Sequence, residues 1–186
     1  ICAGKTTLVD IILGLLRPTE GAISVDGVPI TDDQLRAWQQ SLGYVPQEIF
    51  LTDTTVAENI ALGLPAEQID LDQVVYCARM AQVHDFITQD LPENYKTLVG
   101  KRGVRLSGGQ RQRIGIARAL YHNPEVLVFD EATLGLDVLV ARNLLEVIRA
   151  LRESGKCLIF STHIMSEVQR LCDRIAIIDR KSTRLN

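Results

Sequence analysis

One apolar run constrains the fold more than any other part of the sequence. Val126–Phe129 is continuously apolar with β-branched and aromatic residues, and two acids, Asp130 and Glu131, follow it directly. A strand without polar alternation is buried on both faces, which is typical of a parallel sheet covered by helices. Further runs of this kind lie at residues 42–45, 157–160 and 175–178. We therefore expect an α/β fold whose parallel strands are joined by helical crossovers.

The composition is that of one folded domain. The 186 residues, with 46% hydrophobic and 23% charged side chains, suffice for one domain with a sizeable core. A net charge of -3 argues against non-specific binding to nucleic acid. No apolar run reaches the roughly 18 residues that a membrane span needs, and no signal-peptide pattern is present. The four scattered cysteines indicate reduced thiols in a cytosolic compartment.

Local patterns predict the elements between the strands. Asp26 and Gly27 form a two-residue turn signal between apolar stretches, which predicts a hairpin. Thr31 or Asp32 is expected to cap a short helix that runs to Gln40. Other helices are expected at residues 8–16, 55–62, 71–81, 83–88, 108–121, 138–153 and 164–171.

A second informative feature is the helix start at Ser107, which is a good N-cap. Gly108 and Gly109 weaken the first turn by roughly 1 kcal/mol each relative to alanine, but they leave backbone N–H groups open to close approach. Arg111 and Arg113 place positive charge where the helix macrodipole disfavours it. The pattern indicates a helix end that receives an anion, and the alternative is an ordinary capped helix with solvated arginines.

Near its start the chain carries Gly4, Lys5 and Thr6, which match the end of a phosphate-binding loop, G-x-x-x-x-G-K-[ST]. The glycine allows close backbone approach, the lysine reaches the β- and γ-phosphates, and the hydroxyl can ligate Mg²⁺. Taken alone, such a short match arises by chance about as often as by function. The first glycine of the motif and the strand before it would precede residue 1, so we expect the N-terminal strands to be missing.

The segment Leu106-Ser107-Gly108-Gly109-Gln110 resembles the signature of the ATP-binding-cassette (ABC) ATPases, to which that motif is specific. The resemblance implies a P-loop NTPase fold, in which helices flank a parallel sheet and an α-helical subdomain is inserted at about residues 48–122 of a single domain, 1–186. It also implies ATP and Mg²⁺ as ligands. The residues assigned to nucleotide binding are Gly4, Lys5, Thr6, Thr7, Ser107, Gly108, Gly109, Gln110 and Asp137.

The same resemblance implies the chemistry of the site. Glu131 can orient and deprotonate the attacking water, and Asp130 can hold Mg²⁺ through its water shell. The alternative for this pair is two acids that open a loop.

Two further side chains are assigned to catalysis. His163 follows a core strand, where an imidazole can donate to the γ-phosphate. By the same resemblance, Gln47 is expected to stand in the loop that senses Mg²⁺ and the attacking water. The alternatives are a structural histidine and a surface glutamine in a turn. The residues expected to hold Mg²⁺ are Thr6, Gln47 and Asp130.

The function that the resemblance implies is an ATP-binding and ATP-hydrolysing domain that powers transport across a membrane. Two such domains would pack head to tail, so that the signature of one closes on the ATP of the other. A transmembrane partner domain is expected near Gln47, which places the domain peripherally on the cytoplasmic side of the cell membrane. Alternatives are a catalytically impaired or chimeric ABC fragment and, less in keeping with the sequence, a soluble ABC ATPase acting on nucleic acid or ribosomes, which usually carries coiled-coil insertions or tandem cassettes.

Several positions depart from the family pattern. Cys2 stands at an inner glycine of the phosphate loop, and Lys101 stands where exporters usually have Glu. Residues up to about 133 resemble exporters fused to their membrane domain, whereas residues from about 135 resemble separate ATPase subunits of the ABC-2 and sodium-extrusion type. We therefore expect a junction of two subfamilies near residue 134, a tail of doubtful origin at 181–186, and poor folding or weak ATP binding of the isolated chain.

Overall fold

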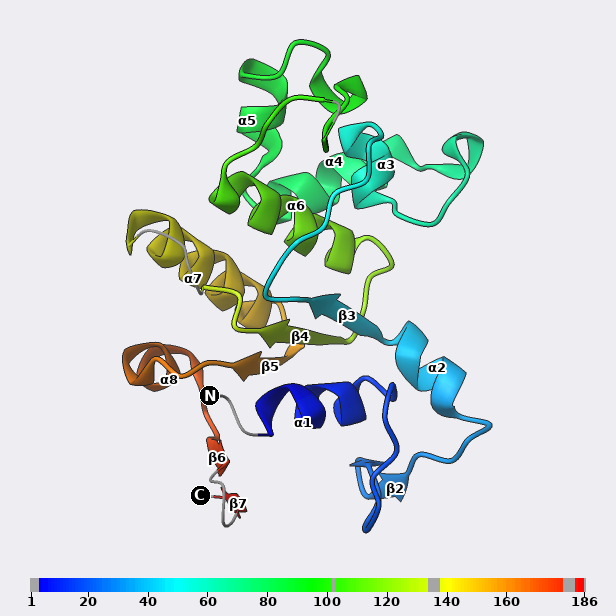
Figure 1. The fold of residues 1–186 in the computed structure, drawn as a ribbon, viewed down its shortest axis with the longest axis vertical. Coiled ribbons are helices and arrows are strands. Elements are labelled where there is room, and N and C mark those ends of the chain that lie inside the picture. The colour runs from blue at the N-terminus through cyan, green and yellow to red at the C-terminus, as the bar shows by residue number, and fades with distance from the viewer. Residues whose placement is uncertain (1–3, 102, 134–137, 179–182, 186) are drawn as a thin grey trace.

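The computed structural model describes residues 4–101, 103–133, 138–178 and 183–185, which form helices and short strands (Figure 1). The helices are α1 (Lys5–Ile12), α2 (Leu35–Gln40), α3 (Val56–Ile60), α4 (Leu71–Met80), α5 (His84–Gln89), α6 (Gly108–Leu120), α7 (Val138–Glu153) and α8 (Met165–Leu171). Short 3₁₀ turns occur at Ala66–Gln68 and Asn94–Lys96. The strands are β1 (Ser24–Val25), β2 (Val28–Pro29), β3 (Leu42–Val45), β4 (Val126–Asp130), β5 (Cys157–Ser161), β6 (Ala176–Ile178) and β7 (Thr183–Leu185). A run of helices from α3 to α6 lies between β3 and β4 in the chain.

The centre of the molecule is a three-stranded parallel sheet in the order β3-β4-β5. Its register pairs Val45 with Phe129 and Phe129 with Phe160, so the three strands end at the same edge. This sheet confirms the predicted α/β class. β4 is the middle strand, as its continuous apolar run requires, and the carboxyl edge of the sheet is where parallel sheets place ligand chemistry.

Successive side chains of β4 pack against different layers. Val128 packs with Val9 and Leu13 of the α1 side, whereas Leu127 and Phe129 belong to the large core that α6 and α7 help to form. This follows from the period of two along a strand, which sends neighbouring side chains to opposite faces. In Figure 1, α1 lies below the sheet and α6 and α7 lie above it.

Helices α3 to α6 form a lobe above the sheet (Figure 1). Its interior is made of fully buried aliphatic side chains, among them Ile60, Val74, Ile87 and Ile114. The sheet and the lobe share one continuous core, because Leu127 and Phe129 belong to the same cluster. The division of the chain into a sheet domain and a helical subdomain at 48–122 stays a prediction.

Two of the predicted helices begin or end elsewhere. The helix expected at 8–16 begins at Lys5 and ends at Ile12, because Gly14 turns into the left-handed region with φ 69°. The helix expected to be capped by Thr31 or Asp32 begins only at Leu35, without a side-chain cap. There Thr31 donates instead to the side-chain oxygen of Gln34, at 3.2 Å from both its backbone nitrogen and its hydroxyl.

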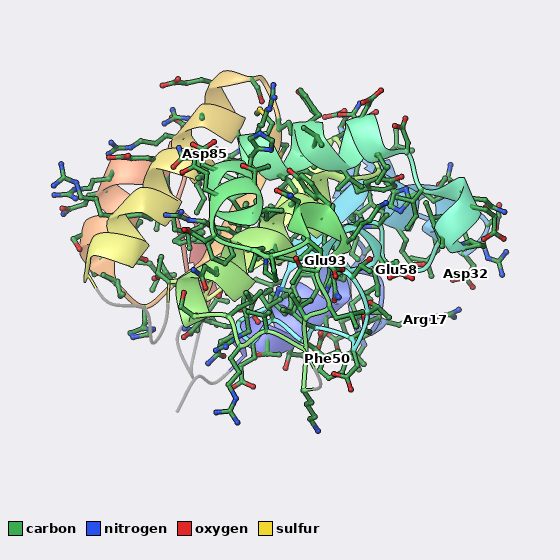
Figure 2. All side chains as sticks on the ribbon, turned by 90° about the horizontal axis from the view of Figure 1, so that it is seen from above. Arg17, Asp32, Phe50, Glu58, Asp85 and Glu93 are labelled. Atoms are coloured by element: carbon green, nitrogen blue, oxygen red, sulfur yellow. The ribbon has the colours of Figure 1, made fainter. Side chains whose placement is uncertain are left out.

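The turn signal at Asp26 and Gly27 forms the predicted hairpin. Asp26 (φ 50°) and Gly27 (φ 81°) form the turn of the β1-β2 hairpin, as expected for a type I′ turn. Arg17 and Asp32, which precede and follow the hairpin in the sequence, are both exposed and form an ion pair at 3.0 Å (both are labelled in Figure 2).

The strand expected at residues 175–178 does not join the central sheet. β6 pairs in antiparallel register with β7, so that residues 183–185 of the doubtful tail form a strand. Within the part of the chain that the structure describes, no helix combines the length and apolar character needed to cross a bilayer.

Candidate functional site

The candidate site lies where β4 and β5 end. Asp130 pairs with Ser161 in the sheet register, and the backbone N–H of Glu131 donates to the carbonyl oxygen of Ser161 at 2.9 Å, which extends the pairing by one residue. Glu131 then adopts φ 46°, a left-handed conformation that a residue with a Cβ rarely adopts. Both acids are buried, with 6% of each residue exposed. A buried carboxylate at the end of a strand requires partners, and two other segments of the chain supply side chains that contact Glu131.

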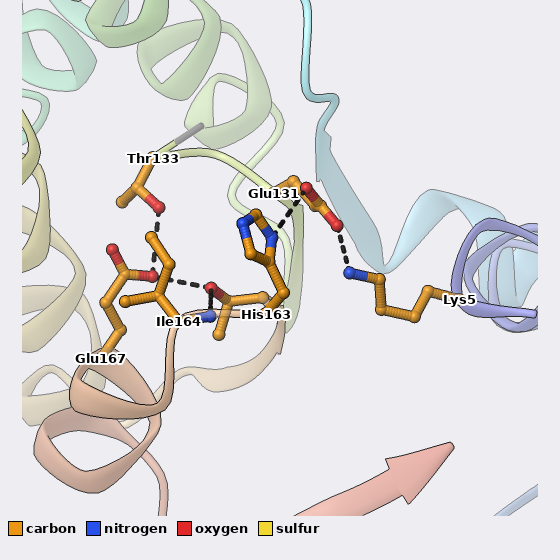
Figure 3. Close-up of polar contacts among 7 residues, drawn as sticks. Lys5, Glu131, Thr133, His163, Ile164 and Glu167 are labelled. Atoms are coloured by element: carbon orange, nitrogen blue, oxygen red, sulfur yellow. Dashed lines mark hydrogen bonds and ion pairs between the residues drawn. The ribbon is translucent and has the colours of Figure 1, made fainter. Parts of the chain in front are cut away.

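The first partner comes from the start of α1. Gly4 has φ 95° and precedes the helix, a conformation that favours glycine. Lys5 is the first helical residue, and its ammonium pairs with the Glu131 carboxylate (Figure 3). Its side chain is 19% exposed, so this ion pair is largely shielded from water. Thr6 and Thr7 follow on the exposed surface of the same turn.

The second partner comes from the segment after β5. Nδ1 of His163 lies 3.3 Å from Oε2 of Glu131, while Lys5 contacts the other carboxylate oxygen (Figure 3). The imidazole is half exposed, which leaves its remaining edge accessible to a ligand. Lys5, Glu131 and His163 are thus brought together from three separate segments: the start of α1, the residue after β4 and the segment after β5.

Near these residues lies a second buried carboxylate, that of Glu167, which was not among the residues expected from the sequence. Oε2 of Glu167, on α8, accepts hydrogen bonds from the hydroxyls of Thr162 at 2.8 Å and Thr133 at 3.1 Å. The hydroxyl of Thr162 also accepts from the backbone N–H of Ile164 at 3.0 Å. The only signal in the sequence was a glutamate in the first turn of a helix that directly follows a core strand.

Two aspartates place negative charge near the phenol of Tyr44 on β3. Burial and then the negative charges of Asp130 and Asp10 raise the pKa of the Tyr44 phenol on β3. Among the described residues no three His, Cys, Asp or Glu side chains gather as a metal site. Mg²⁺ is usually held by one or two protein oxygen ligands together with phosphates and water, so the oxygen donors of Thr6 and Asp130 fit its chemistry.

Gln47 and Asp137 are less defined. Gln47 follows β3, so it stands at the same edge of the sheet as Glu131, and it is exposed. Asp137 lies outside the described residues, as do Cys2 and the predicted junction near residue 134.

The predicted anion-binding helix forms as expected, with Ser107 as N-cap of α6. Its hydroxyl accepts from the N–H of Gln110 at 3.2 Å, and its own N–H donates to the Gln110 side-chain oxygen at 2.7 Å, which is a capping box. Gly108 is exposed and Gly109 is buried in this first turn.

The two arginines of the signature helix are not simply solvated. Arg111 donates to the carbonyl of Leu106 at 2.6 Å, and Arg113 donates to the carbonyl of Gln82 at 3.0 Å. α6 lies on the opposite face of the sheet from α1 (Figure 1). The sheet thus separates the signature helix from the phosphate-loop helix.

Comparison with known proteins gives one consistent result. Residues 2–134 match the profile of the family described as ABC transporter. The heterocyst differentiation ATP-binding protein HepA of a Nostoc species is 40% identical over 179 residues, which are 96% of this chain and 28% of HepA. The ATP-dependent lipid A-core flippase of Burkholderia orbicola is 37% identical over 177 residues, which are 95% of this chain and 29% of the flippase.

A solved structure agrees with these relatives. A bacterial Atm1-family ABC exporter with ATP bound superposes with a TM-score of 0.82 at 37% identity, over 95% of this chain and 30% of the exporter. The chain therefore spans less than a third of the length of each of these proteins. The subfamily assignment of the residues after 134 stays a prediction.

Proposed function

Since this chain belongs to the ABC transporter family, whose ATP-binding domain it resembles in sequence and fold, we propose that it binds and hydrolyses Mg·ATP and thereby powers transport across a membrane. The observation that carries the proposal is the convergence of Lys5, Glu131 and His163 at the carboxyl edge of the sheet. A lysine at a helix start, a buried carboxylate and a half-exposed imidazole are the groups that phosphoryl transfer to water needs.

The roles follow from the contacts. Lys5 leaves Glu131 for the β- and γ-phosphates when ATP binds, and the open N–H groups at the start of α1 receive the same phosphates. Glu131, released from the lysine, orients the attacking water and takes its proton. His163 donates to the γ-phosphate from the side of Glu131, so catalysis depends mainly on positioning and on compensation of charge.

Mg²⁺ supplies neutralisation of phosphate charge when bound. Thr6, Asp130 and Gln47 would hold it, because they offer oxygen atoms at the start of α1 and at the ends of β4 and β3. The low number of protein ligands leaves room for the phosphates.

The remaining roles require other molecules. We infer that Ser107, Gly108, Gly109 and Gln110 act on the ATP of a second ABC domain, and that Asp137 lies in the same interface. The position of α6 and α1 on opposite faces of the sheet supports this arrangement. A transmembrane partner would dock beside Gln47, on the cytoplasmic side of the membrane.

The test is hydrolysis of Mg·ATP by the protein and by its Glu131→Gln variant. We expect hydrolysis to fall by about a hundredfold or more while ATP still binds, because the amide cannot take the proton of water. Glu125→Gln is the matched control, since Glu125 is exposed and precedes β4 at its opposite end. Equal hydrolysis by Glu131→Gln and the parent protein would contradict the assignment, and failure of both to bind ATP would favour an impaired ABC fragment.

A further inference from the structure

Glu167 is a buried carboxylate with no role in the reaction described above. Only 5% of the residue is exposed, although it lies in the first turn of α8 between the exposed Met165 and Ser166 and the exposed Gln169. Burying a carboxylate is costly unless hydrogen bonds compensate for the lost water. The contacts that compensate here are directed at the segments that carry the reacting groups.

Both hydroxyl donors to Glu167 stand close in sequence to a proposed catalytic residue. Thr133 follows Glu131 by two residues, and Thr162 directly precedes His163. One carboxylate oxygen, Oε2, accepts both hydroxyls, at 3.1 Å and 2.8 Å (Figure 3). The segment after β4 and the segment after β5 are therefore both hydrogen-bonded to Oε2 of Glu167.

The residues on both sides of His163, Thr162 and Ile164, take part in hydrogen bonds that fix the turn. The Thr162 hydroxyl donates a hydrogen bond to Glu167 and accepts one from the backbone N–H of Ile164 at 3.0 Å, so that it closes the turn around His163. His163 Nδ1 in turn lies 3.3 Å from Glu131. A shift of about 1 Å in such a site can reduce the rate about a hundredfold.

We propose that Glu167 is a positioning residue for ATP hydrolysis. Its carboxylate, with Thr133 and Thr162, forms a bridge that keeps His163 and Glu131 in register, and we call this set the Glu167 bridge. The inference rests on the proposed function, because it assigns the bridge to the same reaction. Glu167 does not itself contact the nucleotide or the water.

The kinetic test compares Glu167→Ala and Glu167→Gln with the exposed control Gln169→Ala on the same helix. We expect Glu167→Ala to lower kcat by about tenfold to a hundredfold with KM changed by less than about threefold, since orientation rather than binding is lost. Glu167→Gln is expected to recover part of the rate, because its amide oxygen still accepts a hydroxyl proton. A higher KM at unchanged kcat would overturn the proposal.

A second arm separates positioning from a structural role. In a His163→Ala background the Glu167→Ala change is expected to reduce kcat by a clearly smaller factor than in the parent protein, because residues that act through one another are not additive. A merely structural glutamate would cost the same factor in both backgrounds, and that result would overturn the proposal.

Hydrogen exchange in the nucleotide-free protein distinguishes failure of the bridge from failure of the proposed function. Glu167→Ala is expected to raise exchange at the amide of Ile164, and Gln169→Ala is expected to leave it unchanged. Unchanged exchange in Glu167→Ala shows that the bridge does not hold the turn and overturns the inference. Raised exchange in a protein whose parent form does not hydrolyse ATP overturns the proposed function, and the catalytic role of the bridge with it. Should Glu167→Ala not fold, Glu167→Gln replaces it in all three measurements, with smaller effects in the same direction expected.

Discussion

At the scale of single residues, Glu131 shows how the backbone serves the site. Its left-handed φ of 46° costs on the order of 1–3 kcal/mol for a residue with a side chain. That conformation directly follows the last residue of β4, and the side chain reaches both Lys5 and His163. The local strain is therefore compensated by an ion pair and by contact with the imidazole, and it coincides with the residue proposed as the base.

Burial also sets the reactivity of individual cysteine thiols. Burial raises the pKa of the Cys77 thiol to about 11, with a smaller opposing effect of the Lys156 charge. At pH 8 about one Cys77 thiol in a thousand is then ionised, and only the thiolate reacts. We expect iodoacetamide to modify the exposed Cys157 at least about a hundredfold faster than Cys77, as read by peptide mass spectrometry.

Denatured protein is the control for that experiment, because Cys77 and Cys157 should then react at similar rates. Equal rates in the folded protein would show that Cys77 is not buried between α4 and the neighbouring core.

At the scale of elements, helix ends and buried polar side chains fix the helical lobe. Asn59 of α3 is fully buried, and its side chain accepts from the guanidinium of Arg118 of α6 at 3.1 Å and donates to the carbonyl of Thr52 at 3.1 Å. Arg118 also donates to the carbonyls of Asn59 and Phe50, at 2.7 and 2.9 Å. The signature helix is thereby tied to the segment that follows Gln47, which ends in the 71% exposed Phe50.

The start of α3 gives a pH-dependent prediction. Hydrogen bonds from the Thr55 hydroxyl and from its backbone N–H lower the pKa of Glu58, which completes a capping box (Glu58 is labelled in Figure 2). Because the pKa of Glu58 is lower in the folded protein than in the unfolded chain, its carboxylate stabilises the fold fully at a pH above its ordinary pKa of 4.5. This stabilisation is lost as the pH falls through the lowered pKa of the folded protein. We expect Glu58→Ala to reduce the free energy of unfolding by about 0.5–1 kcal/mol at pH 7, and by less below pH 4.5, in urea titrations.

The matched control for this prediction is Glu67→Ala, at an exposed position of a short 3₁₀ turn. A destabilisation by Glu58→Ala that does not change between pH 7 and acid would assign the effect to packing rather than to the carboxylate.

Much of this arrangement follows from sequence patterns, and the remainder depends on contacts between distant segments. The apolar runs predict β3, β4 and β5, and the positions of Glu131 and His163 directly after two of these runs predict that both stand at strand ends. The pairing of Lys5 with Glu131 spans 126 residues, so no local pattern contains it. In the sequence Glu167 looks like any solvated glutamate in the first turn of a helix, because its burial depends on contacts with distant segments.

The antiparallel pairing of β6 with β7 was missed for a related reason. An apolar run predicts a strand but not its partner, because register and neighbours depend on which edges are open.

At the scale of the whole molecule, the sheet divides the two helix ends that are proposed to bind phosphate. α1 packs on the Val128 face, and α6 belongs to the core on the opposite face. This separation is the reason for proposing that an ATP held by Lys5 meets the signature motif of a second copy of the domain.

This arrangement predicts a dimer that depends on both nucleotide and signature. Glu131→Gln with Mg·ATP is expected to elute as a dimer in size-exclusion chromatography with light scattering, because binding without hydrolysis preserves the interface. Adding Ser107→Arg should return the protein to a monomer, since the exposed Ser107 would lie against the phosphates of the other protomer. Lys96→Met, at an exposed turn, is the control and should leave the dimer intact. A dimer that persists with Ser107→Arg would contradict the proposed interface.

The alternation of side chains along β4 also bears on how this chain tolerates mutation. Leu127, Val128 and Phe129 are all fully buried, and neighbours in the strand belong to different layers. None of these three positions is free to vary, because a change of side-chain size at any of them creates a void or a clash in one layer or the other. Substitutions in β4 are therefore expected to be retained during evolution only together with compensating changes in α1 on one side or in α6 and α7 on the other. This requirement would make β4 the slowest-evolving part of the domain.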